Sequence, residues 1–107
     1  MHVMEGSEVQ LKINFDFGSF LVNNIRYPSE DRSHNIQGKV FVTFVIERDG
    51  TVTDIRILRA PSETLANEAL RVMHLCPVWI PGFQHGEPVR VQYTVPIAFT
   101  LNGKRLD

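Results

Sequence analysis

The last third of the chain alternates apolar and polar residues over thirteen positions, VRVQYTVPIAFTL, from Val89 to Leu101. The odd positions are all apolar, whereas the even positions carry Arg, Gln, Thr, Pro, Ala and Thr. Because successive side chains of a strand point to opposite faces, this period predicts one long strand with one face on a core. Pro96 has no N–H for a ladder, which confines such a strand to a sheet edge or a bulge.

Two further strands are predicted in the middle of the chain, joined by a tight turn. The segment KVFVTFVIE, Lys39 to Glu47, is apolar on both faces, as is typical of a central strand. Asp49-Gly50 follows, and this pair tolerates the positive φ angles that a two-residue hairpin turn needs. We therefore expect an antiparallel return from Thr51 to Leu58, with Ile55 and Ile57 toward the core.

One amphipathic helix is predicted between this hairpin and the final strand. From Glu63 to Leu75 the apolar residues fall along one side and the charged residues along the other. Ser62 is placed to cap its N-terminus, and Pro77 stops it. A helix with one apolar side packs on a sheet, so we expect it to cover one face of the strands.

The N-terminal region predicts two shorter elements. Val9 to Phe17 alternates strictly and favours a half-buried strand. A brief helix is expected after Ser19 as its cap, and it ends before Tyr27-Pro28 because a proline biases the preceding residue away from the helical region. We interpret Ser29 to Gln37 as a polar loop.

Together these elements predict an α+β fold. A right-handed helical crossover returns the last strand antiparallel to Lys39–Glu47 on its free side. The sheet then has three antiparallel strands in the order second, first, third, with a packed helix, a short N-terminal helix and an extra N-terminal strand. The expected organisation is one domain over 19–102, an N-terminal extension over 1–18 and a tail over 103–107.

Composition narrows the function classes. The 107 residues carry a net charge of −1, with 11 Lys and Arg against 12 Asp and Glu, which gives no electrostatic case for nucleic acid. No run approaches the roughly 18 apolar residues that span a bilayer, and the start, MHVMEGSEVQ, lacks a signal-peptide profile. We expect the chain as given to be soluble, or to be a fragment of a membrane-anchored parent.

Catalytic and metal-binding constellations are not evident in the pattern. His74 and Cys76 stand two apart on the predicted helix and point to different sides, so they cannot share a metal. Cys76 continues an apolar helix side, which favours a small buried hydrophobic residue over a nucleophile. The Glu30-Asp31 pair lies in the predicted loop, where solvated charge accounts for it. We expect no enzyme activity, no metal and no cofactor, and therefore a binding module.

The backbone of the final strand is the strongest candidate site. Exposed strand edges pair readily with other chains, and proteins usually blunt them with charge, proline or brevity. This strand carries Arg90 and Pro96, yet it is longer than its predicted partner, which leaves an overhang for an extended peptide. Pairing with Val9–Phe17 of the same chain, or with a second copy in a dimer, is the alternative.

Five short motifs lie in order between Phe20 and Leu101. The motifs are Tyr27-Pro28, Gly38-Lys39-Val40, Asp49-Gly50, Pro77-x-Trp79-x-Pro81-Gly82 and Val95-Pro96-Ile97-x-Phe99. Together they resemble the TonB C-terminal domain family, in the form common among Bacteroidetes-type sequences.

The resemblance implies a periplasmic domain at the end of an inner-membrane-anchored, energy-transducing protein. Such a domain transmits energy from an ion-gradient-driven motor complex to outer-membrane transporters, by pairing its last strand with a segment of the transporter's N-terminal plug. In the same comparison Trp79 is a core residue beneath the Pro-Gly turn. The implied partner-binding residues are Val89, Arg90, Val91, Gln92, Tyr93, Thr94, Val95, Pro96 and Ile97 on the strand, with Tyr27, Pro28 and Arg32 beside the docked segment.

The resemblance leaves a second function open. TonB-like domains also occur fused to other membrane proteins, including sensors and peptidase receptors. The same edge would then bind a periplasmic partner in signalling without moving it.

Overall fold

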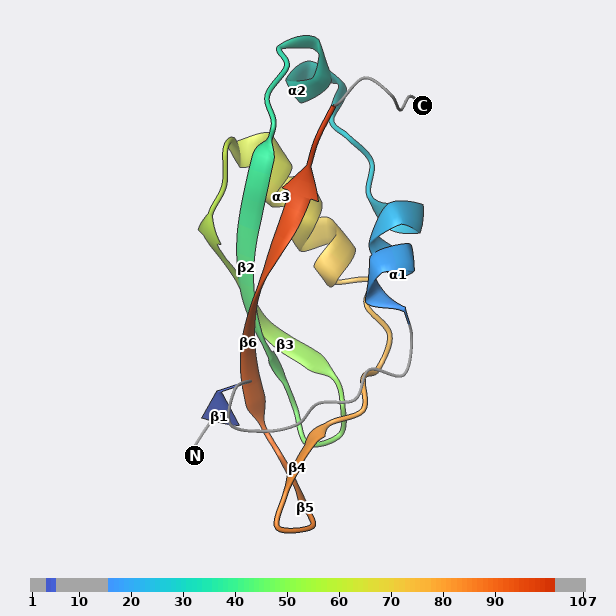
Figure 1. Ribbon diagram of the computed structural model, residues 1–107, viewed down its shortest axis with the longest axis vertical. Helices are drawn as coiled ribbons and strands as arrows, with labels where there is room; N and C mark the ends of the chain where they lie inside the picture. Colours follow the sequence, from blue (N-terminus) through green and yellow to red (C-terminus); the bar gives the residue numbers. More distant parts are fainter. Residues whose placement is uncertain (1–3, 6–15, 102–107) are drawn as a thin grey trace.

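Three antiparallel strands form the centre of a mixed α+β structure (Figure 1). The computed structural model describes residues 4–5 and 16–101. Its elements in chain order are β1 (Met4–Glu5), α1 (Phe17–Asn24), α2 (Ser29–Ser33), β2 (Gly38–Ile46), β3 (Val52–Arg59), α3 (Glu63–Met73), β4 (Gly82–Gln84), β5 (Glu87–Val89) and β6 (Val91–Phe99).

The predicted sheet order is confirmed. The strands lie in the order β1-β6-β2-β3, and β2 pairs antiparallel with both β3 and β6. The ladder between β2 and β6 runs without a break from Gly38 opposite Phe99 to Ile46 opposite Val91. On the far side of β6, the short strand β1 pairs in parallel at Val91 and Gln92.

Strand β2 is buried on both faces, as its composition predicts. Val40, Val42, Phe44 and Ile46 are at most 1% exposed and face the main core. Val45, on the opposite face, is only 4% exposed. The apolar content of this strand therefore reflects its central place in the sheet.

Helix α3 covers one face of the sheet and completes the core. Ser62 caps it by accepting a hydrogen bond from the Leu65 N–H at 3.1 Å, as predicted. Its buried residues include Leu65 and Ala69, both 0% exposed. The helix ends at Met73, two residues before the predicted end, and Leu75 is 51% exposed.

Trp79 lies in the core, as predicted, and its backbone bonds to Gly50 of the hairpin turn between β2 and β3. It is 3% exposed, and its ring centroid lies 5.6 Å from that of Phe44 and 5.4 Å from that of Phe17. Burying an aromatic side chain of this size contributes roughly 2–3 kcal/mol. The connection after α3 is therefore fixed to the sheet by its tryptophan.

The first helix begins earlier than predicted, and Phe17 belongs to it and not to a strand. Asp16 is the cap, because its carboxylate accepts from the Ser19 N–H at 3.1 Å and from the Ser19 hydroxyl at 2.9 Å. Ser19 therefore stands inside the helix. An aspartate three residues before a free helical N–H competes well for the cap position. The rest of the predicted strand, 9–15, lies outside the described residues.

The predicted polar loop contains helix α2, which corrects the expectation for Ser29–Gln37. Pro28 stands at its N-terminus, where its missing N–H costs nothing and its φ of −59° suits the helix. The Arg32 N–H donates to the Pro28 carbonyl at 2.9 Å. Asp31 is 2% exposed, so the expectation of a solvated carboxylate was wrong at this position.

The expectation of a thirteen-residue final strand was also wrong. A small hairpin, β4–β5, turns at His85-Gly86 with φ of 55° and 79°, and ends at Val89. Arg90 interrupts the strand, and its guanidinium Nε lies 2.7 Å from Glu47 Oε1. The period of two continues through this position, so the sequence pattern could not show the break.

Candidate functional site

The sheet has two outer strands of different character. Strand β3 pairs irregularly with β2, with register shifts between Phe41 and Val42 and between Thr43 and Val45. Asp54 on β3 has a φ of +50°, and its carboxylate binds the Arg56 guanidinium at 2.8 Å. Bulges and charges of this kind protect an edge from further pairing. The β3 edge is therefore blunted.

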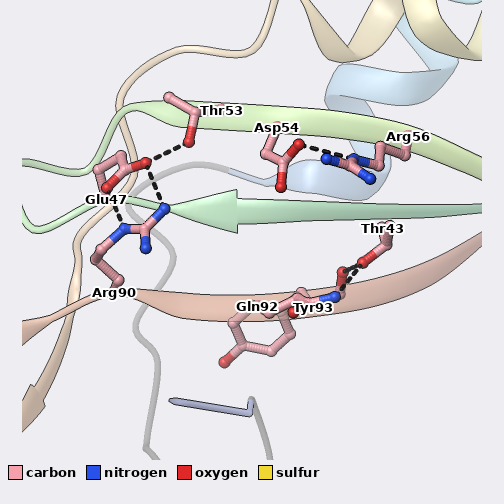
Figure 2. Close-up of polar contacts among 8 residues, drawn as sticks. All are labelled: Thr43, Glu47, Thr53, Asp54, Arg56, Arg90, Gln92 and Tyr93. Carbon is pink, nitrogen blue, oxygen red and sulfur yellow. Dashed lines mark hydrogen bonds and ion pairs between the residues drawn. The ribbon is translucent and has the colours of Figure 1, made fainter. Parts of the chain in front are cut away.

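Strand β6 has a regular ladder on one side, and side-chain contacts show which backbone groups face it (Figure 2). The Tyr93 carbonyl accepts a hydrogen bond from Thr43 Oγ1 of β2 at 3.0 Å, so this carbonyl points toward β2. In an antiparallel ladder the N–H and C=O of one residue point to the same side, and successive residues alternate. The odd-numbered residues of β6 thus bond to β2, and the even-numbered ones face the other way.

A second contact agrees with this assignment. On the other side of β2, the Glu47 N–H donates to the Thr51 carbonyl at 2.8 Å, so the odd residues of β2 bond toward β3. The even residues of β2 are then left for β6, and they stand opposite the odd residues of β6. Both observations therefore give the same alternation of inward and outward backbone N–H and C=O groups along β2 and β6.

The alternation explains the proline in the strand. Pro96 is even-numbered, so its nitrogen faces away from β2 and its missing N–H removes no bond from the ladder with Phe41. On this outer side β1 pairs only as far as Gln92, and no other described strand continues along β6. Thr94 and Ala98 therefore present N–H and C=O groups to an edge that no described strand covers, which we call the open edge. Pro96 leaves one donor missing between them.

Tyr27 and Arg32 lie beside the far end of this edge. The Tyr27 ring packs edge-on against Phe99 with centroids 5.6 Å apart, and its hydroxyl donates to the Ile36 carbonyl. The Arg32 guanidinium lies 5.4 Å from the centre of the Tyr27 ring. Partial burial, and then the charge of Asp31, raise the pKa of Tyr27 above its usual value. Tyr27 is thus an anchored, neutral residue.

The structure divides the predicted partner-binding residues into two groups. Gln92, Thr94 and Pro96 present their backbone to the outer side, and Gln92 is partly engaged with β1. Ala98 also faces outward, as the even-position pattern of the strand indicates, although it was not among the named binding residues. Four of the remaining residues direct both side chain and backbone inward, namely Val91, Tyr93, Val95 and Ile97. The other two lie outside β6, with Val89 in β5 and Arg90 just before β6.

Glu47 holds the two neighbouring strands together near the start of β6 (Figure 2). Its carboxylate accepts from Arg90 Nε at 2.7 Å and also from the Thr53 hydroxyl. These hydrogen bonds, from Arg90 first and then Thr53, hold the pKa of Glu47 below its usual value. Arg90 is therefore engaged within the chain.

Cys76 has the character of a packing residue. The thiol is half-buried, and burial raises its pKa to about 11. At neutral pH it is protonated and a poor nucleophile.

Among residues 16–101 no three His, Cys, Asp or Glu side chains gather as metal ligands would. No helix in this part of the chain is long and apolar enough to cross a bilayer.

A small α+β domain with one blunted edge and one open edge is a candidate protein-binding module of the strand-addition type. Residues 23–101 match the family model described as the Gram-negative bacterial TonB protein C-terminal. The chain belongs to this family of TonB C-terminal domains.

Curated and solved relatives agree with this assignment. Protein TonB of Helicobacter pylori strain J99 is 33% identical over 81 residues, which cover 71% of this chain and 26% of the relative. The solution structure of the Helicobacter pylori TonB C-terminal domain matches with 29% identity and a TM-score of 0.60, over 79% of this chain and 77% of that one. The Pseudomonas aeruginosa domain, at 24% identity, shows the same fold with a TM-score of 0.67, over 98% and 100% of the two chains.

Proposed function

We propose that this chain is the periplasmic binding domain of an energy-transducing TonB-like protein. It binds the N-terminal plug segment of an outer-membrane transporter by adding that segment as a strand to β6, and it acts by binding and not by catalysis. The observation that carries the proposal is the open outer edge of β6 in a TonB C-terminal domain, with the backbone of Thr94 and Ala98 facing outward.

Strand addition suits the transmission of force. A docked segment bonds along β6 through backbone groups, so its affinity depends little on side chains. A pull along the strand direction loads several ladder bonds together. The unbroken ladder from Gly38–Phe99 to Ile46–Val91 then passes this load from β6 into the buried strand β2.

The coupling of inner-membrane energy to transport is the finer part of the proposal. The chain spans 26% of the length of the curated relatives that it matches, so the activity of the whole protein is part of the proposal. We assign the link to the inner-membrane motor complex to a membrane anchor in a longer parent protein. A sensor or peptidase receptor carrying the same domain would use the same edge for a different partner.

The first experiment is an amide-shift titration by NMR. The labelled domain is titrated with short peptides from the plug termini of co-encoded outer-membrane transporters. We expect shifts along Tyr93–Thr100 and near Tyr27–Arg32, with little change on the β3 edge at Val52–Arg59. Peptides that move none of the β6 amides would contradict the proposal.

The same titration separates the alternative of self-pairing. If β6 amides shift with protein concentration in the absence of peptide, a second copy occupies the edge. Sedimentation at the same concentrations identifies such a dimer, and the transporter proposal then gives way to an assembly role.

A further inference from the structure

The outer face of the sheet beside the open edge carries a cation that nothing in the described chain neutralises. Lys39 stands directly opposite Ala98 in the ladder between β2 and β6. Their neighbours Val40 and Ile97 are 0% and 1% exposed in the core, so Lys39 and Ala98 share the opposite, exposed face. Within residues 16–101 no carboxylate lies within ion-pair distance of Lys39.

The neighbouring surface reinforces the positive charge. Lys39 lines a hollow on this face with Phe41 and Arg59, and the Arg59 guanidinium lies 4.6 Å from the centre of the Phe41 ring. Arg59 also has no carboxylate partner among the described residues. Two uncompensated cations on one small face attract an anionic group.

The position of Ala98 lets a docked strand reach this charge. A residue paired with Ala98 would place its side chain on the same face as Ala98 and Lys39, because cross-strand pairs share a face in either strand direction. Its Cα would lie two strand spacings from Lys39, roughly 9.6 Å. The methyl group of Ala98 does not block the space between, and a lysine side chain is long and flexible.

The other outward positions have no cation opposite them on the neighbouring strand β2. Thr94 stands opposite Thr43, which is 5% exposed, and Pro96 stands opposite Phe41, whose ring packs against the Arg59 guanidinium of β3. Lys39 is therefore the cation that stands on the strand next to β6, and it lies at the end of the open edge, opposite Ala98. This position favours one register of the docked strand.

We infer that Lys39 selects a partner segment with a carboxylate side chain at the residue that pairs with Ala98. The inference rests on the proposed strand addition at β6 and names the chemistry of the segment that binds there: an extended peptide with Asp or Glu at one defined position. The ion pair is on the surface, so its contribution is modest and falls with salt.

The test uses a capped eight-residue peptide of alternating threonine and valine. One threonine at a time is replaced by glutamate, glutamine or lysine, and binding is followed by the β6 amide shifts. A glutamate at one position should bind about two- to fivefold more tightly than glutamine there, and a lysine more weakly. At 0.5 M salt the difference should largely disappear.

Charge reversal on the domain supplies the decisive comparison. Lys39→Glu should invert the preference, so that the lysine peptide binds better than the glutamate peptide. Arg48→Glu is the matched control, because it reverses a charge at an exposed position of the hairpin turn at the other end of β2 and should leave the preference unchanged.

The outcomes separate the two proposals. If the β6 amides shift with every peptide and neither the charge nor Lys39→Glu alters the affinity, the inference about Lys39 is wrong while strand addition stands. If no peptide, including those from transporter plugs, shifts the β6 amides, strand addition itself is wrong.

Discussion

Both the N–H and the carbonyl group of Trp79 lie against Gly50. The Trp79 N–H donates to the Gly50 carbonyl at 2.8 Å, and a Cβ built on Gly50 would lie 1.9 Å from the Trp79 carbonyl oxygen. Gly50 also has a φ of +89°, which disfavours any side chain. The hairpin turn between β2 and β3 and the connection after α3 are therefore joined through a glycine.

Replacing Gly50 with alanine should destabilise the fold strongly. The added methyl group would strain the φ angle and also force the Trp79 backbone to move. We therefore expect the free energy of unfolding in urea to fall by about 3 kcal/mol or more. Gly86→Ala is the control, because Gly86 has a φ of +79° but no atom within 4 Å of the added Cβ. The free energy of unfolding of Gly86→Ala should fall by only about 1–2 kcal/mol. Equal losses in the two variants would rule out the Trp79 contact as the cause.

Two proline substitutions test the alternation of β6. Val95 bonds toward β2, so Val95→Pro should remove a ladder bond and cost about 2 kcal/mol or more in stability. Ala98 faces outward, so Ala98→Pro should keep the melting temperature close to that of the parent and weaken peptide binding roughly two- to tenfold. Calorimetry and the NMR titration measure the two effects. A stable Val95→Pro variant would show that the assignment of inward and outward residues is reversed.

Removing the Asp31 carboxylate should loosen the packing of α2 on α3. Asp31 is 2% exposed and accepts hydrogen bonds from the Ser62 hydroxyl, at 3.2 Å, and from the Thr64 hydroxyl. Asp31→Ala removes the carboxylate that accepts from both hydroxyls and leaves them each other, 3.1 Å apart, as side-chain partners. We expect the free energy of unfolding to fall by about 1–3 kcal/mol. The exposed neighbour supplies the comparison, since Glu30→Ala should change stability by less than about 0.5 kcal/mol. Thermal unfolding of the two variants distinguishes them.

The Glu47–Arg90 pair should make stability depend on pH in the acid range. The pKa of Glu47 is lower in the folded state, so its contribution is present above its unfolded pKa of about 4.5. The contribution is lost as the pH falls through the lower folded pKa. The stability difference between the parent and Glu47→Gln should therefore shrink between pH 6 and pH 3. Urea titrations of the two proteins across this pH range measure the difference.

Cys76 should react slowly with thiol reagents. With a pKa of about 11 its thiolate population at pH 8 is small, so alkylation by iodoacetamide should be roughly a hundredfold slower than for an exposed cysteine. The rate should rise to that of a free thiol in urea. Fast alkylation of the folded domain would show that the thiol is neither buried nor protonated as the structure indicates.

The sequence by itself determined the elements that depend on local pattern. Alternation identifies the last strand, and a run that is apolar on both faces identifies the central one. Asp49-Gly50 identifies the turn and Ser62 identifies the start of α3, because each depends on the conformational preference of neighbouring residues. Pro96 also places the last strand at an edge, since the missing N–H is a property of the residue itself.

Only the tertiary structure decided the features that depend on register and distant contacts. Arg90 interrupts the strand where its guanidinium bonds to Glu47, which is 43 residues away in the sequence. Asp31 is buried against the start of α3, where the hydroxyls of Ser62 and Thr64 donate to its carboxylate. The choice of Thr94 and Ala98 over Tyr93 and Val95 as the outward groups follows from pairing with β2, and a shift of one residue would reverse it.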